Sequence, residues 1–98
     1  MTVEKKLLIE KSAEISMILK AMGHPKRLMI LCLLREGEKS VSELENYCSI
    51  SQSQVSNFLK RMLQDELLVN RRDGNTIYYS VKDKKILKLT KQIQQIFC

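Results

Sequence analysis

The sequence predicts a small, mainly α-helical domain with one β-hairpin, in the order α-α-α-α-β-β-α. Apolar residues recur at helical spacing along most of the chain, and this spacing changes to alternation between Leu67 and Val81. A length of 98 residues suits one domain. No repeat, low-complexity tract or linker divides the chain, so residues 1–98 are expected to form a single domain.

The first helix is predicted from about Lys5 to Met22. Its apolar residues recur at the steps that place side chains on one face of a helix, namely Leu8, Ile15, Leu19 and Met22. Gly23 comes next and is expected to end the helix, because glycine is a poor helix former.

The second helix is predicted to begin at Pro25. Proline suits a first helical turn because an N–H would have no partner there, and His24 stands before it at the cap position. The run Leu28–Leu34 is apolar on every side, which predicts a buried helix. We expect it to end at Gly37.

Two further helices are predicted on either side of a tight turn at Cys48-Ser49-Ile50. Ser40 and Glu43 have the spacing of a capping box, which predicts a short helix to about Tyr47. The next helix is predicted from about Ser51 to Gln64, with an apolar stripe of Val55, Leu59, Met62 and Leu63.

A hairpin and a last helix complete the chain. Apolar residues alternate before and after Asp73-Gly74-Asn75, which is typical of two strands joined by a turn. The last helix is predicted from about Asp83 to Cys98. Its apolar residues, Ile86, Leu89, Ile93 and Ile96, form a seam suited to another helix, including that of a second copy.

Charge is unevenly distributed along the chain. Residues 1–49 contain eight basic and seven acidic side chains, and residues 50–98 contain nine and four, so the second half carries +5 of the net +6. This asymmetry favours a polyanionic partner, although a basic soluble domain would look similar. No apolar stretch is long enough to span a membrane and no signal-peptide core is found, so we expect a cytoplasmic protein.

The predicted helix at Ser51–Gln64 has the side chains of a DNA-reading helix. Its first turns carry short hydroxyl and amide groups, which suit base edges in a major groove, at Gln52, Ser53, Gln54, Ser56 and Asn57. An ordinary solvated face would favour Glu and Lys instead. Two short helices, a tight turn and a hairpin together form the layout of a winged helix-turn-helix. Lys60 and Arg61 are candidate phosphate contacts on this helix. Arg72 is the candidate on the wing, favoured over Arg71 because it shares the parity of Asn70, which is expected to face outward.

The chain resembles the ArsR-type winged helix-turn-helix repressors over nearly its whole length. The residues that carry the resemblance are Met22–Leu31, Ser40–Leu44, Ile50–Ser56 and Ile77–Val81. It implies a homodimer, held by the first and last helices, that binds an inverted-repeat operator in double-stranded DNA. The family's metal sites are not matched, because Ser40-Val41-Ser42 stands where a Cys-Val-Cys-like element is found and the last helix lacks His. We expect no metal and no cofactor.

Cys32 and Cys98 are candidate redox-sensing residues. They stand in the second and last helices, which could pack together, and this placement suggests a dithiol switch. The alternatives are a core thiol at Cys32 and a frayed helix end at Cys98. Their positions resemble the branch of the family that includes the biofilm-growth repressor and HlyU, in which two thiols react with persulfide or oxidant and become linked. Cys48 is interpreted as core filler.

Two positions depart from the family pattern. Phe58 stands where members commonly carry His, which is expected to alter packing under the DNA-reading helix. Glu66 stands where many carry a helix-ending Gly. It is expected to place a non-glycine residue in a costly turn conformation, or to change the turn.

Three hypotheses for function remain open from the sequence. The first is a transcriptional repressor switched by the Cys32–Cys98 dithiol. The second is a repressor whose thiols bind a soft metal such as Cu(I). The third is a winged-helix module that binds proteins and not DNA, which the amide-rich helix argues against. Enzymatic activity is not expected, because His24 is the lone His and no catalytic triad or cofactor loop is found.

Overall fold

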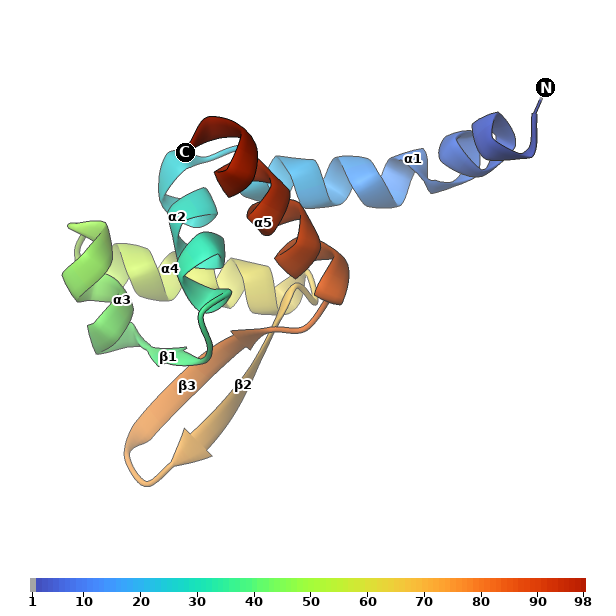
Figure 1. Cartoon of the computed structure of the whole chain (residues 1–98). Helices are drawn as coiled ribbons and strands as arrows, with labels where there is room; N and C mark the ends of the chain where they lie inside the picture. The colour runs from blue at the N-terminus through green and yellow to red at the C-terminus, as the bar shows by residue number, and fades with distance from the viewer. Residues whose placement is uncertain (1) are drawn as a thin grey trace.

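Five helices and a small antiparallel sheet at one side of them make up this computed structural model, which describes residues 2–98 (Figure 1). The fold class expected from the sequence, mainly helical with a hairpin wing, is confirmed. The helices are α1 (Val3–Met22), α2 (Pro25–Leu34), α3 (Val41–Cys48), α4 (Gln52–Gln64) and α5 (Lys84–Phe97). The strands are β1 (Lys39–Ser40), β2 (Leu68–Asp73) and β3 (Thr76–Val81).

Polar side chains cap the start of each helix. Thr2 accepts a hydrogen bond from the Lys5 N–H at 3.2 Å, so α1 begins two residues earlier than predicted. The predicted cap at His24 is confirmed, and its Nδ1 accepts from the Lys26 N–H at 3.1 Å. The Ser40–Glu43 capping box before α3 is also confirmed.

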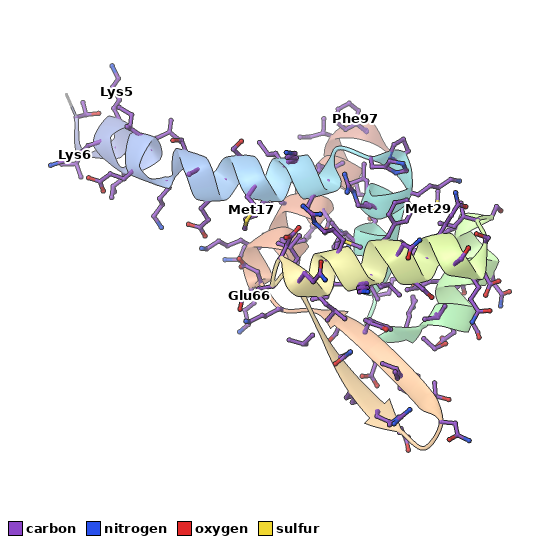
Figure 2. The ribbon with its side chains drawn as sticks, turned by 180° about the vertical axis from the view of Figure 1, so that it is seen from behind. Lys5, Lys6, Met17, Met29, Glu66 and Phe97 are labelled. Carbon is purple, nitrogen blue, oxygen red and sulfur yellow. The ribbon has the colours of Figure 1, made fainter. Side chains whose placement is uncertain are left out.

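The end of α4 is fixed by a Schellman motif centred on Glu66. The Leu67 N–H donates to the Met62 carbonyl at 2.9 Å, and the Glu66 N–H donates to the Leu63 carbonyl at 3.0 Å. Glu66 adopts φ +61°, so the expected costly conformation at this position is confirmed. Figure 2 shows Glu66 where α4 leads into the hairpin.

The sheet contains a strand that the sequence did not predict. Its order is β1-β3-β2, and β1 pairs with β3 through Lys39↔Tyr79 and Ser40↔Tyr78. The predicted hairpin is confirmed, with Gly74 at φ +62° in its turn. The strands β2 and β3 extend away from the helices as a long wing (Figure 1).

The core lies where α2, α3, α4 and α5 meet, and it corrects two predictions about α2. This helix ends at Leu34 and not at Gly37. Its apolar run is not buried on every side, because Ile30, Leu31 and Leu34 face the core whereas Met29 is 38% exposed.

The apolar seam predicted on α5 is buried at its beginning and exposed at its end. Ile86 is fully buried in the protomer's own core together with Thr90, because this side of α5 packs against α2 and β3. Ile96 is 71% exposed, and Leu89 and Ile93 are half-buried. Only part of the seam is therefore available to a second copy.

Helix α1 extends well beyond the body of the molecule (Figure 1). Only Ile18, Ala21 and Met22, near its C-terminal end, are buried. Its other large apolar side chains are exposed, namely Val3, Leu7, Leu8, Ile9, Ile15, Met17 and Leu19. Within residues 2–98, no helix combines the length and apolarity that crossing a membrane requires.

Candidate nucleic-acid interface and dithiol site

The outer side of α4 is polar, and its inner side holds the helix in the core. Val55, Leu59 and Met62 are buried, which leaves the predicted DNA-reading residues exposed. These fall into two rows at helical spacing: Ser53, Asn57 and Lys60 form one, and Gln52 and Ser56 form the other. The structure thus brings five of the predicted residues onto one accessible surface.

Gln54 also contributes to folding. Its Oε1 accepts a hydrogen bond from the Ser51 N–H at 3.4 Å, and the Gln54 N–H donates to Ser51 Oγ at 3.2 Å. This is a second capping box, which was not predicted although Ser51 and Gln54 have its spacing. The Gln54 carbonyl oxygen is engaged at the helix start, so Gln54 is the weakest of the candidates for reading bases.

The wing adjoins the beginning of α4. Gln52 lines a cavity of about 250 Å³ together with Ser42, Asn75 and Thr76. Asn75 and Thr76 belong to the hairpin turn and the start of β3. The hairpin tip and the first residue of α4 therefore line the same cavity.

The two wing arginines differ in their surroundings. Arg71 Nε donates to Glu38 Oε2 at 2.8 Å, and its guanidinium lies 4.8 Å from the centre of the Tyr78 ring. The hydrogen bond to Arg71 holds the pKa of Glu38 below its usual value. Within residues 2–98, Arg72 has no such side-chain partner and is exposed. Of the two wing arginines, Arg72 is thus the one without such a partner among the described residues. The predicted outward parity of Asn70 and Arg72 is wrong, because both share the side of β2 that carries the buried Leu68, and Val69 is exposed instead.

Cys32 and Cys98 line the same cavity between α2 and α5. Its volume is about 540 Å³, and its apolar walls include Leu28, Met29 and Phe97. Cys32 is half-buried and Cys98 is exposed, and neither forms a disulfide in this structure. The two predicted thiols, 66 positions apart, are thus brought together away from the wing, at the end of the molecule where Phe97 projects in Figure 2.

Burial is the main influence on the Cys32 thiol. It raises the pKa of Cys32, and the positive charge of Arg35 opposes this increase in part. Arg35 also lines the cavity, and its guanidinium donates a hydrogen bond to Gln94 Oε1 on α5. Arg35 was not among the predicted site residues, although its i,i+3 spacing from Cys32 places the two on one side of α2.

Cys48 is fully buried, as a core residue would be. Burial raises the pKa of its thiol, and Lys26 lowers it in part. Lys26 Nζ donates to the Cys48 carbonyl at 3.0 Å and so ties the first turn of α2 to the end of α3. Beside it, the ring of His24 contacts Phe58 with centroids 4.9 Å apart. Both contacts join the start of α2 to the helix-turn-helix.

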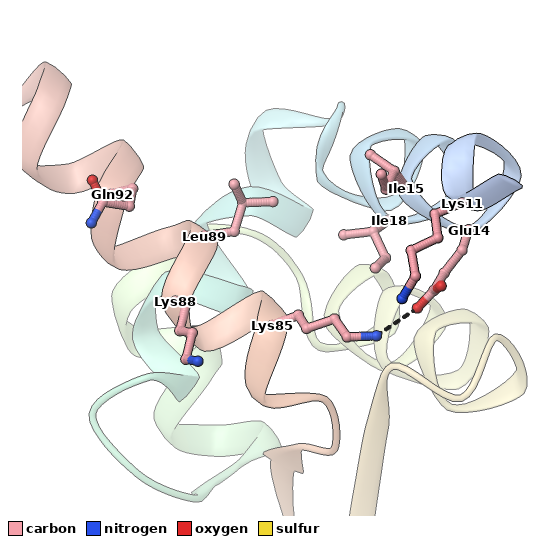
Figure 3. Close-up of a pocket in the computed structure, with 8 residues that line it drawn as sticks. All are labelled: Lys11, Glu14, Ile15, Ile18, Lys85, Lys88, Leu89 and Gln92. Carbon is pink, nitrogen blue, oxygen red and sulfur yellow. Dashed lines mark hydrogen bonds and ion pairs between the residues drawn. The ribbon is translucent and has the colours of Figure 1, made fainter. Parts of the chain in front are cut away.

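An apolar groove separates α1 from α5 (Figure 3). Its volume is about 470 Å³, and Ile15, Ile18 and Leu89 form its apolar part. Lys85 Nζ and Glu14 Oε1 form an ion pair of 2.8 Å across it, and this pairing lowers the pKa of Glu14. Within the part of the chain that is described, no three His, Cys, Asp or Glu side chains are grouped as metal ligands.

Comparisons with known proteins converge on one family. Residues 24–69 match the family described as "Bacterial regulatory protein, arsR family". The transcriptional activator HlyU of Vibrio cholerae is 32% identical over 91% of this chain and 82% of its own length. The biofilm growth-associated repressor of Xylella fastidiosa is 37% identical over 92% of this chain and 80% of its own.

One solved structure matches the whole chain. The crystal structure of the transcriptional repressor BigR from Xylella fastidiosa superposes with a TM-score of 0.92 and 34% sequence identity. The match covers 100% of this chain and 98% of the other. The winged arrangement described above is thus shared from end to end with a protein of related sequence.

Proposed function

The chain belongs to the arsR family of bacterial regulatory proteins, and on that premise we propose that it is a homodimeric repressor whose DNA affinity is switched by a Cys32–Cys98 dithiol. Its relatives are transcriptional regulators, so this chain is a DNA-binding transcriptional regulator. The observation that carries the switch is the single cavity that both thiols line.

Exposed polar residues of α4 support a role in reading an inverted-repeat operator. Ser53 and Asn57 stand in its outer row, and Gln52 lies beside the wing. Lys60 and Arg72 provide positive charge for phosphates on either side. Two-fold symmetry would present two such helices to successive major grooves of double-stranded DNA, one helical turn apart.

The dimer itself is supported by apolar surface that the protomer leaves uncovered. Leu8, Ile15 and Leu19 form an exposed row on α1, and Ile96 is exposed on α5. A contiguous apolar surface of this kind marks a protein interface. Between the two helices, the groove in Figure 3 adds Ile15, Ile18 and Leu89 to the apolar surface.

The chemistry proposed for the thiols balances without a further oxidant. Cys98 is the exposed thiol and reacts first with a persulfide, R–S–SH, giving Cys98–S–SH and RSH. The Cys32 thiolate then attacks Cys98 Sγ, the inner sulfur of the persulfide, which forms the Cys32–Cys98 disulfide, breaks the S–S bond of the persulfide and releases HS⁻, which is protonated to H₂S. A second equivalent of persulfide would leave one additional sulfur atom in the bridge, which spans thiols too distant for a direct disulfide.

Linking α2 to α5 would affect DNA binding through the start of α2. That helix contacts the helix-turn-helix at both His24–Phe58 and Lys26–Cys48. Each tenfold loss of DNA affinity requires only about 1.4 kcal/mol. A covalent link that changes the angle of α2 by a small amount can therefore release the operator.

Serine variants test the switch directly. Cys32→Ser and Cys98→Ser should each bind operator DNA as tightly as wild type and remain bound after persulfide treatment. Cys48→Ser is the matched control and should dissociate normally. Fluorescence anisotropy measures binding, and intact mass spectrometry measures the link. Dissociation of either of the first two variants like wild type would disprove the pairing.

A further inference from the structure

Cys98 borders a second cavity that differs from the first in its chemistry. This cavity of about 380 Å³ is lined by Arg35, Lys91, Gln94, Gln95 and Cys98. Three of these residues, Arg35, Gln94 and Cys98, also line the cavity shared with Cys32. The exposed thiol therefore stands between an apolar groove and a shallow depression lined by basic and amide side chains, which we name the cationic pocket.

The cationic pocket has the composition of an anion site. Arg35 and Lys91 are two positive charges, Gln94 and Gln95 contribute amide donors, and no acidic side chain is among its lining residues. Glu36, the acidic residue nearest in sequence to Arg35, lines the apolar cavity instead. Arg35 donates one hydrogen bond to Gln94 Oε1, which orients the guanidinium and leaves its other N–H groups for a ligand.

We propose that the cationic pocket binds the carboxylate of an anionic organic persulfide and presents its outer sulfur to Cys98. This inference rests on the proposed dithiol function and specifies its sulfur donor. In the step concerned, the Cys98 thiolate attacks the S–H sulfur of R–S–SH. A bond forms between Cys98 Sγ and the outer sulfur, and the S–S bond of the donor breaks. The electron pair leaves on RS⁻, which takes up the proton that Cys98 gave to water.

Arg35 and Lys91 would assist both the binding of the donor and the departure of RS⁻. An arginine fork binds a carboxylate with two parallel hydrogen bonds, whereas lysine acts as a point charge. The same positive charges stabilise the departing thiolate of the donor. A neutral donor of equal size would gain only part of this benefit.

The test compares two small donors on protein in which Cys98 is the only thiol. The persulfides of 3-mercaptopropionate and 2-mercaptoethanol differ chiefly in the carboxylate. Sulfur addition to Cys98 is timed by mass spectrometry in a Cys32→Ser/Cys48→Ser background. Adding Arg35→Gln and Lys91→Gln should lower the ratio of the anionic to the neutral rate roughly fivefold to fifteenfold at low salt. Taking the ratio cancels the intrinsic reactivity of each donor.

A matched control and a second probe complete the design. Lys84→Gln with Lys88→Gln removes the same charge from α5 outside the cationic pocket and should leave the ratio unchanged. Alkylation of Cys98 by iodoacetate and by iodoacetamide should show the same change in ratio without sulfur chemistry. In wild type, the preference for the anionic reagent should decrease as salt screens the charges.

The outcomes separate this inference from the function on which it rests. If the ratios are the same in both double variants, the cationic pocket does not select anions and the inference is overturned. That result would leave the dithiol switch intact, provided that wild type still links Cys32 to Cys98. Failure of wild type to form the link with either donor would instead overturn the proposed switch.

Discussion

Among single residues, Glu66 carries a conformational cost that glycine would not. The left-handed region costs an L-residue about 1–2 kcal/mol, and Glu66 is held there by the Schellman motif after α4. Replacing Glu66 with glycine would remove this cost. Part of the gain in stability is lost again, because glycine makes the unfolded chain more flexible. We expect Glu66→Gly to raise the free energy of unfolding by about 0.5–1 kcal/mol.

Urea unfolding of two variants checks this expectation. Glu66→Ala removes the carboxylate but keeps the Cβ, and it should give little or no increase in stability. Equal gains from Glu66→Ala and Glu66→Gly would show that the side-chain charge matters and that the backbone conformation does not.

The reactivity of Cys32 should depend on pH in a direction set by its burial. Its folded-state pKa is raised, so the thiolate fraction at neutral pH is smaller than that of an exposed thiol. The alkylation rate of Cys32 should therefore still increase with pH above 9.0, which is the ordinary pKa of a cysteine thiol. Because Arg35 lowers this pKa, Arg35→Gln should move the midpoint further upward. Iodoacetamide labelling in a Cys48→Ser/Cys98→Ser background measures both, and a midpoint below 9.0 would contradict the prediction.

Among the helices and strands, the features that depend on neighbouring residues could be predicted from the sequence. His24, Pro25, Ser40 and Glu43 located two helix starts because a cap depends on residues within a few positions. The strand β1 was missed because its two residues have no strand pattern, and only pairing with β3 defines it. Likewise, Ile86 and Ile96 share a periodic pattern, and tertiary packing alone determines that one is buried and the other exposed.

In the candidate site too, local features could be predicted from the sequence, whereas contacts between distant residues could not. The exposed polar face of α4 could be predicted from residue types and spacing. The use of Gln54 in a capping box narrowed that set of candidates, whereas the pair of Arg71 with Glu38 was not predicted. Arg71 and Glu38 lie 33 positions apart, so no local pattern connects them. For the same reason, the pairing of Cys32 with Cys98 drew support from a family resemblance as well as from helix assignments.

Helix α4 and the wing should contribute differently to DNA binding. Asn57→Ala should weaken binding to the cognate operator by about 1–3 kcal/mol and hardly affect random DNA, because an amide reads base edges. Arg72→Ala should weaken binding to all sequences and reduce the salt slope by about 1 for each phosphate that is no longer neutralised. Binding titrations of both variants with the cognate operator and with random DNA, each at several salt concentrations, test these expectations. Equal losses on random DNA for Asn57→Ala would remove it from the specificity residues.

Gln54 offers a test of the second capping box. Gln54→Ala should lower the free energy of unfolding by about 0.5–1 kcal/mol, because the start of α4 loses a partner for the Ser51 N–H. Gln54→Glu keeps the acceptor and should retain the stability. Thermal unfolding distinguishes the two, and equal melting temperatures would show that this hydrogen bond contributes nothing.

For the molecule as a whole, the exposed row on α1 predicts the assembly state. Leu8→Glu or Leu19→Glu should give a folded monomer, because both side chains are more than half exposed in the protomer. Operator affinity should fall with dimerisation, since one recognition helix would then bind alone. Ala13→Glu adds the same charge on another face of α1 and should remain dimeric. Light scattering with circular dichroism checks this, and a dimeric Leu19→Glu would place the interface elsewhere.

A small tilt of α2 at Cys32 would move the other end of this helix, where Lys26 contacts the helix-turn-helix. Cys32 lies six positions after Lys26, which is about 9 Å along a helix axis. If the bridge to α5 tilted α2 by about 10° around Cys32, the end held to the Cys48 carbonyl would move by roughly 1.5 Å. Hydrogen bonds weaken steeply beyond a few tenths of an ångström from their preferred length. A rotation small enough to leave the core packed would thus be sufficient to take the helix-turn-helix out of register with the bases.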